Sequence, residues 1–150
     1  TENPVNNLTV SDIRDIYCSE TPCWSDYADY DRPANTYQLE ENNGSQTAFR
    51  NIVDGNELGE HHREVQGMQE IIDCVADDSG GICYAFLMYF QERHNRDECR
   101  TVKVNGFGVD SPEYPLQYEV FLISREDNDD VRVKDLINEV SEISIVKYLF

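Results

Sequence analysis

Residues 82–90 read Ile-Cys-Tyr-Ala-Phe-Leu-Met-Tyr-Phe, a run that is apolar at every position and rich in aromatic side chains. Gly80 and Gly81 stand directly before it, and paired glycines interrupt regular structure. Nine residues are few for a helix, so the run favours a central strand that is covered on both faces. It is also less than half as long as a membrane-spanning helix, so we expect no insertion into a membrane.

Shorter patterns on either side of this run predict further strands. Residues 35–40 and 47–53 are expected to pair as a hairpin around the turn Asn42-Asn43-Gly44. The segments 100–104, 117–122 and 144–150 alternate in polarity or are rich in β-branched and aromatic residues, which is typical of strands. The first 34 residues are expected to be irregular and stapled by cysteines, because prolines interrupt them.

Two segments predict helices. One has an apolar face made by Val65, Met68, Ile71, Ile72 and Val75, and it should end near Val75 because Asp77 and Asp78 oppose the helix dipole. The other runs from residue 131 to about 143, with Asp130 as its N-cap. The sequence therefore predicts a β-rich single domain over residues 1–150, a sandwich or layered sheet with about two short helices; the alternative is an α+β fold.

The charge balance restricts the partners. Thirty acidic residues against twelve Lys and Arg give a formal charge of −18. Such a field repels phosphate backbones and anionic membrane surfaces, so we expect no nucleic-acid partner. It attracts basic proteins and speeds their encounter. The alternative is an acidic surface that only keeps the protein soluble.

The cysteines and sequons suggest an oxidising compartment. None of the five cysteines forms a Cys-x-x-Cys pair, so we expect disulfides rather than a zinc site, with the connectivity left open. The disulfide candidates are Cys18, Cys23, Cys74, Cys83 and Cys99. Asn7 and Asn43 begin two N-glycosylation sequons. Together these features predict a secreted glycoprotein.

No constellation in the chain predicts catalysis, a metal or a cofactor. His61 and His62 are adjacent and therefore point in different directions, which favours a solvated loop. Residues 127–130 resemble the start of a calcium loop but lack its later glycine and glutamate, and no nucleophile has a base and an orienting group. Trp24, Tyr27 and Tyr30 lie among acidic residues and are candidates for partner binding; the alternative is that they belong to the core.

The stretch from Ile82-Cys83-Tyr84-Ala85-Phe86 to Glu98-Cys99-Arg100, with cysteines on or beside expected strands, resembles a repeat of the abalone vitelline envelope receptor for lysin. These tandem domains are of the zona pellucida N-terminal type. The resemblance implies an immunoglobulin-like β-sandwich, cell adhesion in fertilization, binding of the strongly basic sperm protein lysin and assembly into egg-coat filaments. It also implies nested bridges, here Cys74–Cys83 inside and Cys18 or Cys23 with Cys99 outside. The close spacing of Cys74 and Cys83 and the fifth cysteine depart from that pattern.

Three functions follow from these features. The first is a non-enzymatic extracellular recognition domain of the egg vitelline envelope, either complete or one module of a longer tandem-repeat protein. The second is a secreted lipocalin-like carrier of small ligands, which the β-rich chain with a late helix favours. The third is an acidic inhibitor or immunity protein that covers a basic enzyme.

Overall fold

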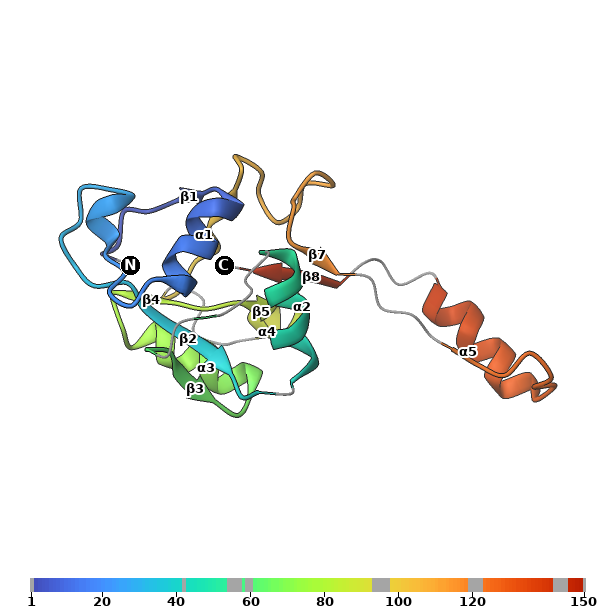
Figure 1. Cartoon of the computed structure of the whole chain (residues 1–150). Helices are drawn as coiled ribbons and strands as arrows, with labels where there is room; N and C mark the ends of the chain where they lie inside the picture. The colour runs from blue at the N-terminus through green and yellow to red at the C-terminus, as the bar shows by residue number, and fades with distance from the viewer. Residues whose placement is uncertain are drawn as a thin grey trace.

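The computed structural model describes residues 2–41, 43–53, 58, 61–92, 98–118, 123–141 and 146–149. In these residues the strands form three small sheets, and helices lie between and beside them (Figure 1). The sheet at the centre is parallel, and parallel strands need crossover connections, usually helices. The prediction of an immunoglobulin-like β-sandwich is therefore wrong, and the fold is mixed α/β.

The central sheet has the order β3-β2-β4. It pairs β2 (Asn35–Leu39) with β3 (Arg63–Val65) on one side and with β4 (Gly81–Ile82) on the other. The chain crosses from β2 to β3 through α2 (Gly44–Ile52), and from β3 to β4 through α3 (Met68–Ala76). β2 is thus the middle strand, and four of its five residues are buried.

The N-terminal segment is more regular than expected. Its first strand, β1 (Asn7–Leu8), pairs in parallel with β6 (Lys103–Val104). α1 (Val10–Cys18) begins with a capping box, in which Thr9 Oγ1 accepts from Asp12 N at 3.0 Å and Asp12 Oδ2 accepts from Thr9 N at 2.7 Å. A short 3₁₀ turn, η1 (Trp24–Asp26), follows.

The apolar run 82–90 is divided among three elements. Its first residue ends β4, and the run continues into β5 (Ala85–Phe86) and α4 (Leu87–Glu92), so the single central strand was a wrong prediction. β5 belongs to an antiparallel sheet of order β5-β8-β7, with β7 (Gln117–Tyr118) and β8 (Val146–Leu149). β7 and β8 confirm the expected strands in part, and residues 119–122 lie outside the described chain.

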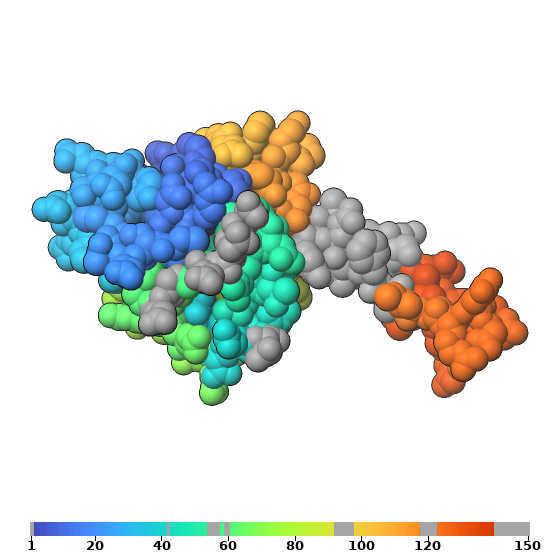
Figure 2. Space-filling view, in the orientation of Figure 1, coloured from blue at the N-terminus to red at the C-terminus, as the bar shows by residue number. Residues whose placement is uncertain are grey.

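Both predicted helices exist. α3 ends at Ala76, close to the predicted end, but Gly67 is its N-cap and Val65 belongs to β3. α5 (Val131–Ser141) begins after Asp130, whose Oδ1 accepts from Arg132 N at 2.9 Å. In Figures 1 and 2 α5 stands apart from the rest of the described residues. Its apolar residues are accordingly open, since Leu136 is 50% exposed and Val131 66%.

A buried aromatic cluster joins the helices to the central sheet. Tyr17 from α1 meets Phe49 from α2 edge-on at 4.8 Å, and Phe49 stacks on Tyr84 at 4.2 Å. The Tyr17 hydroxyl lies 3.2 Å from the carbonyl of Tyr37 in β2 and 3.3 Å from that of Ile82 in β4. These contacts hold α1 and α2 against the sheet. Within the described residues no helix is long and apolar enough to cross a membrane.

Candidate functional site

The middle strand β2 places polar side chains inside the protein. Successive side chains of a strand point to opposite faces, so Thr36 and Gln38 share one face and Tyr37 and Leu39 the other. Both polar residues are nevertheless buried, with Thr36 1% and Gln38 7% exposed. A buried polar group costs free energy unless it is hydrogen-bonded, so their partners are informative.

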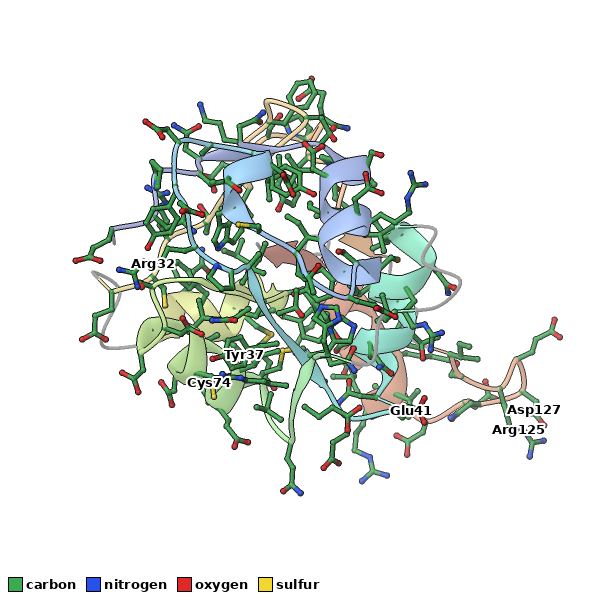
Figure 3. All side chains as sticks on the ribbon, turned by 60° about the vertical axis from the view of Figure 1, so that its left-hand side comes forward. Arg32, Tyr37, Glu41, Cys74, Arg125 and Asp127 are labelled. Carbon is green, nitrogen blue, oxygen red and sulfur yellow. The ribbon has the colours of Figure 1, made fainter. Side chains whose placement is uncertain are left out.

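Gln38 lies in a large polar hollow of about 1340 Å³. The hollow is enclosed by the end of α1, the strands β2 and β3, the helix α2 and the residues that precede β3. Figure 3 labels Glu41, which lies between β2 and α2, two residues after the end of β2. The described lining residues are Cys18, Glu20, Gln38, Glu41, Gln46, Arg50, Leu58, His61, His62 and Glu64.

The orientation of the Gln38 amide is determined by its neighbour. Gln38 Nε2 donates to Glu64 Oε1 at 3.3 Å, and a carboxylate only accepts, so the amide nitrogen must face it. The amide oxygen is thereby turned away from Glu64. Gln38 Oε1 is buried and has no hydrogen-bond partner in the described structure. It is a buried acceptor without a donor, in a side chain that lines the hollow.

The two histidines form a second polar group at this hollow. His62 Nδ1 lies 2.7 Å from Thr36 Oγ1, and the two imidazole rings are 4.6 Å apart. Burial, together with His61, lowers the pKa of His62 to about 4, and burial also lowers the pKa of His61. His62 is therefore neutral near pH 7. Its Nε2 and both ring nitrogens of His61 have no partner among the described residues.

The helix α2 begins at the hollow. Asn43 is its N-cap, and Asn43 Oδ1 accepts from Ser45 N at 2.9 Å. Ser45 and Gln46 in the first turn are 7% and 4% exposed. The predicted hairpin over 35–53 is thus wrong in its second half, because the turn residue Asn43 starts a helix rather than a second strand.

Acidic side chains outnumber permanently cationic ones among the described residues that line the hollow. Of the described lining residues, Glu20, Glu41 and Glu64 carry carboxylates, and Arg50 is the one permanently charged cation. Cys18 also lines the hollow, but partial burial raises the pKa of its thiol, which disfavours a thiolate nucleophile. No group of three or more His, Cys, Asp or Glu in the described residues is arranged to hold a metal ion. The arrangement suits binding through hydrogen bonds.

A second hollow of about 550 Å³ lies between α3, the N-terminal segment and residues 98–102. Buried apolar side chains line much of it, among them Trp24, Ile72 and Ile82. At its edge the Arg100 guanidinium donates to the carbonyl groups of Asn3 and Val5. None of its described lining residues is a buried polar side chain comparable with Gln38, and we therefore place the candidate site in the polar hollow.

The three aromatic candidates for partner binding pack within the protein. Trp24 is 2% exposed, and its Nε1 donates to Gly80 O at 2.9 Å, so it belongs to the core. Tyr27 packs edge-on against Trp24 at 6.4 Å, and the Tyr30 hydroxyl reaches Ser79 O at 3.4 Å. All three aromatics therefore take part in the packing of the N-terminal segment.

Disulfide pairing and glycosylation remain predictions from the sequence. Cys18 is exposed, and the other four cysteines are half-buried. Asn7 is exposed, and its Oδ1 accepts from Gly106 N at 2.7 Å. Asn43 is half-buried and uses its Oδ1 as the helix cap. Disulfide pairing and glycosylation can be tested by mass spectrometry of the native protein.

Sequence reasoning missed Gln38, Glu41, Gln46 and Glu64. A signal for Gln38 was present, because it is a polar residue within an otherwise strand-like segment, but its burial depends on helices that were not predicted. His61 and His62 were considered and assigned to a solvated loop. Both are half-buried, and His62 contacts Thr36, which lies two residues before Gln38 in β2.

No family profile matches the sequence, whereas solved structures do resemble the fold. A putative phosphate ABC transporter substrate-binding protein from Clostridium perfringens, solved with bound phosphate, is 21% identical, with a TM-score of 0.65 over 99% of this chain. An ABC-type phosphate transport receptor from Vibrio cholerae is 15% identical, with a TM-score of 0.70 over 93%. PstS from Borrelia burgdorferi is 14% identical, with a TM-score of 0.65 over 99%. The chain spans 51%, 59% and 53% of these three chains.

These likenesses overturn the resemblance to an egg-coat repeat. A zona pellucida N-type sandwich does not contain the parallel sheet described above, and the similar structures bear no relation to cell adhesion or fertilization. Lysin, egg-coat filaments, the lipocalin-like carrier and the acidic inhibitor are likewise unsupported, as is the vitelline envelope as a location. The predictions of a secreted and of a non-enzymatic protein are compatible with the similar structures, whose names describe transport proteins. The chain has the fold of about half of a phosphate-transport substrate-binding protein.

Proposed function

We propose that this chain is a non-enzymatic ligand-binding lobe that captures a small polar solute in the polar hollow, in the manner of an ABC transporter substrate-binding protein. The observation that carries the proposal is Gln38, which lines that hollow, is 7% exposed and has a buried amide oxygen without a hydrogen-bond partner. A buried acceptor of this kind is costly unless a ligand or an ordered water satisfies it.

The position of the hollow in the fold supports the same function. Ligands of open parallel sheets bind outside the carboxyl ends of the strands, and Glu41 of the lining lies beyond that end of β2. β2 leads through Glu40 and Glu41 into the capped start of α2 at this point. The hollow is also larger than the usual range of about 300–1,000 Å³ for small-ligand pockets, so a small solute would fill it together with water or a second lobe.

The architecture of the whole protein follows from the same proposal. The similar chains are about twice as long as this one, so a second lobe would close over the hollow. The 150 residues then form one lobe and an outlying helix, and the protein acts outside the cytoplasm beside a membrane transporter. The second lobe and the location are inferred from the likeness of fold, and both are refuted if the chain binds no ligand.

Inorganic phosphate is the second candidate, as the ligand bound in the Clostridium perfringens structure. The start of α2 favours it, because the positive end of the helix dipole attracts anions. The carboxylates of Glu20, Glu41 and Glu64 oppose it.

The test is a binding screen on the 150-residue chain by isothermal titration calorimetry, with amines, amino acids, sugars and inorganic phosphate at constant ionic strength. We expect one class to bind with a stoichiometry near one. The matched variants are Glu41→Gln, inside the hollow, and Glu40→Gln, next to it in sequence but outside the lining. Loss of affinity in the first variant alone places the ligand in the hollow. A screen in which nothing binds, or in which both variants behave alike, would refute the proposal.

A further inference from the structure

We infer that α5 is a docking surface for a second copy of this chain, with the two α5 helices packed antiparallel in a symmetric dimer. This dimer goes beyond the proposed function and does not depend on which ligand the polar hollow binds. Three features of α5 support it: an apolar stripe, the order of the charges beside that stripe, and the position of the helix away from the other described residues.

The apolar stripe of α5 is partly exposed. Val133, Leu136 and Ile137 are spaced three and four residues apart, so they share one face of the helix. In Figures 1 and 2 α5 stands apart from the other described residues, and Leu136 is 50% exposed. A helix this short gains most of its stability by packing its apolar face against a partner.

The charges beside the stripe run in an order that a single helix disfavours. Arg132 and Glu139 are seven residues apart, about two turns, so they lie on the same side of α5, one at its start and one near its end. The helix dipole favours the opposite order, with acids at the start and bases at the end. In an antiparallel pair, Arg132 lies beside Glu139 of the partner subunit, and the same contact repeats at the other end. The second copy thus supplies the charge that each terminus lacks.

The present partner of Arg132 is easily exchanged. The Arg132 guanidinium lies 2.6 Å from Asp130 Oδ2, but the Arg132 side chain is 89% exposed. Exposed ion pairs of this kind contribute little to stability. Asp130 caps the helix without the ion pair, because its Oδ1 accepts from Arg132 N. Arg132 can therefore turn to a carboxylate of a second helix at little cost.

The position of α5 reduces the repulsion between two acidic chains. The whole chain carries −18, which opposes self-association, but residues 123–141 contain six acidic and three basic residues and so carry only −3 of it. In Figure 1 the C-terminal end of α5 faces the other described residues, and its start lies at the far tip. An antiparallel helix pair therefore places the two strongly acidic parts at opposite ends. Parallel packing would place them together and set like charges at the same level.

Sedimentation equilibrium of the 150-residue chain, from about 10 to 500 μM at about 0.15 M salt, tests the dimer. We expect a monomer–dimer equilibrium with a Kd on the order of 0.1 mM, because two helices of 11 residues bury less than a standard interface of about 1,200–2,000 Å². Leu136→Gln should weaken the dimer tenfold or more, by removing the centre of the stripe.

Charge reversal tests the antiparallel arrangement. Arg132→Glu and Glu139→Arg should each weaken the dimer about fivefold or more, and the double reversal in one chain should restore it to within about twofold. Asp135→Lys is the matched control, because it changes the net charge as Glu139→Arg does but lies away from the stripe, and it should not weaken the dimer. Each single reversal places a charge that the helix dipole favours, so weaker association would not come from loss of α5.

Each outcome decides. A chain that stays monomeric at 500 μM overturns the inference and leaves the stripe to a different partner or to solvent. A dimer that is insensitive to the single reversals, or that the double reversal does not restore, packs through another surface and also overturns it. Assemblies that grow beyond two copies overturn it as well, because a symmetric contact between two copies closes on itself.

Discussion

Gly80→Ala should destabilise the protein because a side chain at this position has no room. A Cβ built on Gly80 would lie 2.6 Å from the carbonyl oxygen of Pro33, closer than real Cβ atoms approach backbone atoms. The turn cannot easily move away, because the Gly80 carbonyl accepts from both Asn35 N and Trp24 Nε1 at 2.9 Å. Residue 80 thus fixes the start of β4 against the start of β2.

The magnitude follows from these contacts. Overpacking costs about 1–3 kcal/mol, and straining two hydrogen bonds adds about 1 kcal/mol, while alanine restrains the unfolded chain and returns about 0.5 kcal/mol. We expect a net loss of about 1.5–3.5 kcal/mol, from a total that is commonly about 5–15 kcal/mol. At a urea m-value of roughly 2 kcal/mol/M, the midpoint should fall by about 0.8–1.8 M.

Urea unfolding followed by fluorescence measures this directly, because Trp24 is the single tryptophan and is buried. Gly44→Ala is the matched control, since nothing lies within 4 Å of a Cβ there and the residue is helical. The control should be neutral or stabilising by up to about 1 kcal/mol. If Gly80→Ala unfolds at the wild-type midpoint, the close approach of Pro33 has no energetic weight and the reasoning is wrong.

Three further predictions address the cap, the buried imidazole and the outlying helix. Asn43→Ala removes the N-cap of α2 and should cost about 1 kcal/mol in urea unfolding, with Asn43→Ser, another good cap, nearly neutral. Burial lowers the pKa of His62 to about 4 from an ordinary value of 6.5, so the unfolded state gains a proton first on acidification, and stability should fall between pH 6.5 and 4. Comparing the pH dependence of wild type and His62→Gln checks this, and parallel curves would contradict it. Leu136→Gln should change stability by less than about 0.5 kcal/mol because that side chain is 50% exposed, whereas the fully buried Leu39→Ala should cost about 2–5 kcal/mol by thermal or urea melts.

Local signals predicted some elements and failed at others for identifiable reasons. β2, α3 and α5 were found because their apolar residues repeat with a clear period and are bounded by turn or capping residues. The run 82–90 is apolar throughout and therefore carries no period that separates strand from helix. Its division into β4, β5 and α4 depends on contacts with distant segments such as β2 and β8.

Two of the errors could have been avoided. Thr9 and Asp12 have the spacing of a capping box. The apolar residues that follow have helical spacing, so α1 could have been predicted; they are Ile13, Ile16 and Tyr17. In 47–53, Ala48, Phe49, Ile52 and Val53 also fit one helical face, but the Asn-Asn-Gly sequence was read as a hairpin turn. Because α2 was not predicted, the predicted fold lacked the crossover helix that allows β2 and β3 to run parallel.

The candidate site was beyond local reasoning for a different reason. Glu41 and Glu64 are ordinary surface acids in sequence, and nothing local places them beside Gln38. Gln38 lies beside Glu64 because of the parallel register of β2 and β3. The acidity of the chain is visible in its composition, whereas the position of Glu20, Glu41 and Glu64 around one hollow is not.

The pairing of β1 with β6 has a consequence for how the protein is made. Val10 N donates to Asn105 Oδ1 across 95 residues, and Gly106 N donates to Asn7 Oδ1 across 99. On a ribosome adding about 5–20 residues per second, the first strand would wait roughly 5–20 s for its partner to be synthesised. During that interval Leu8, which is 1% exposed in the finished fold, faces water or a chaperone. β1 can therefore pair with β6 only after the strands of the central sheet have been synthesised.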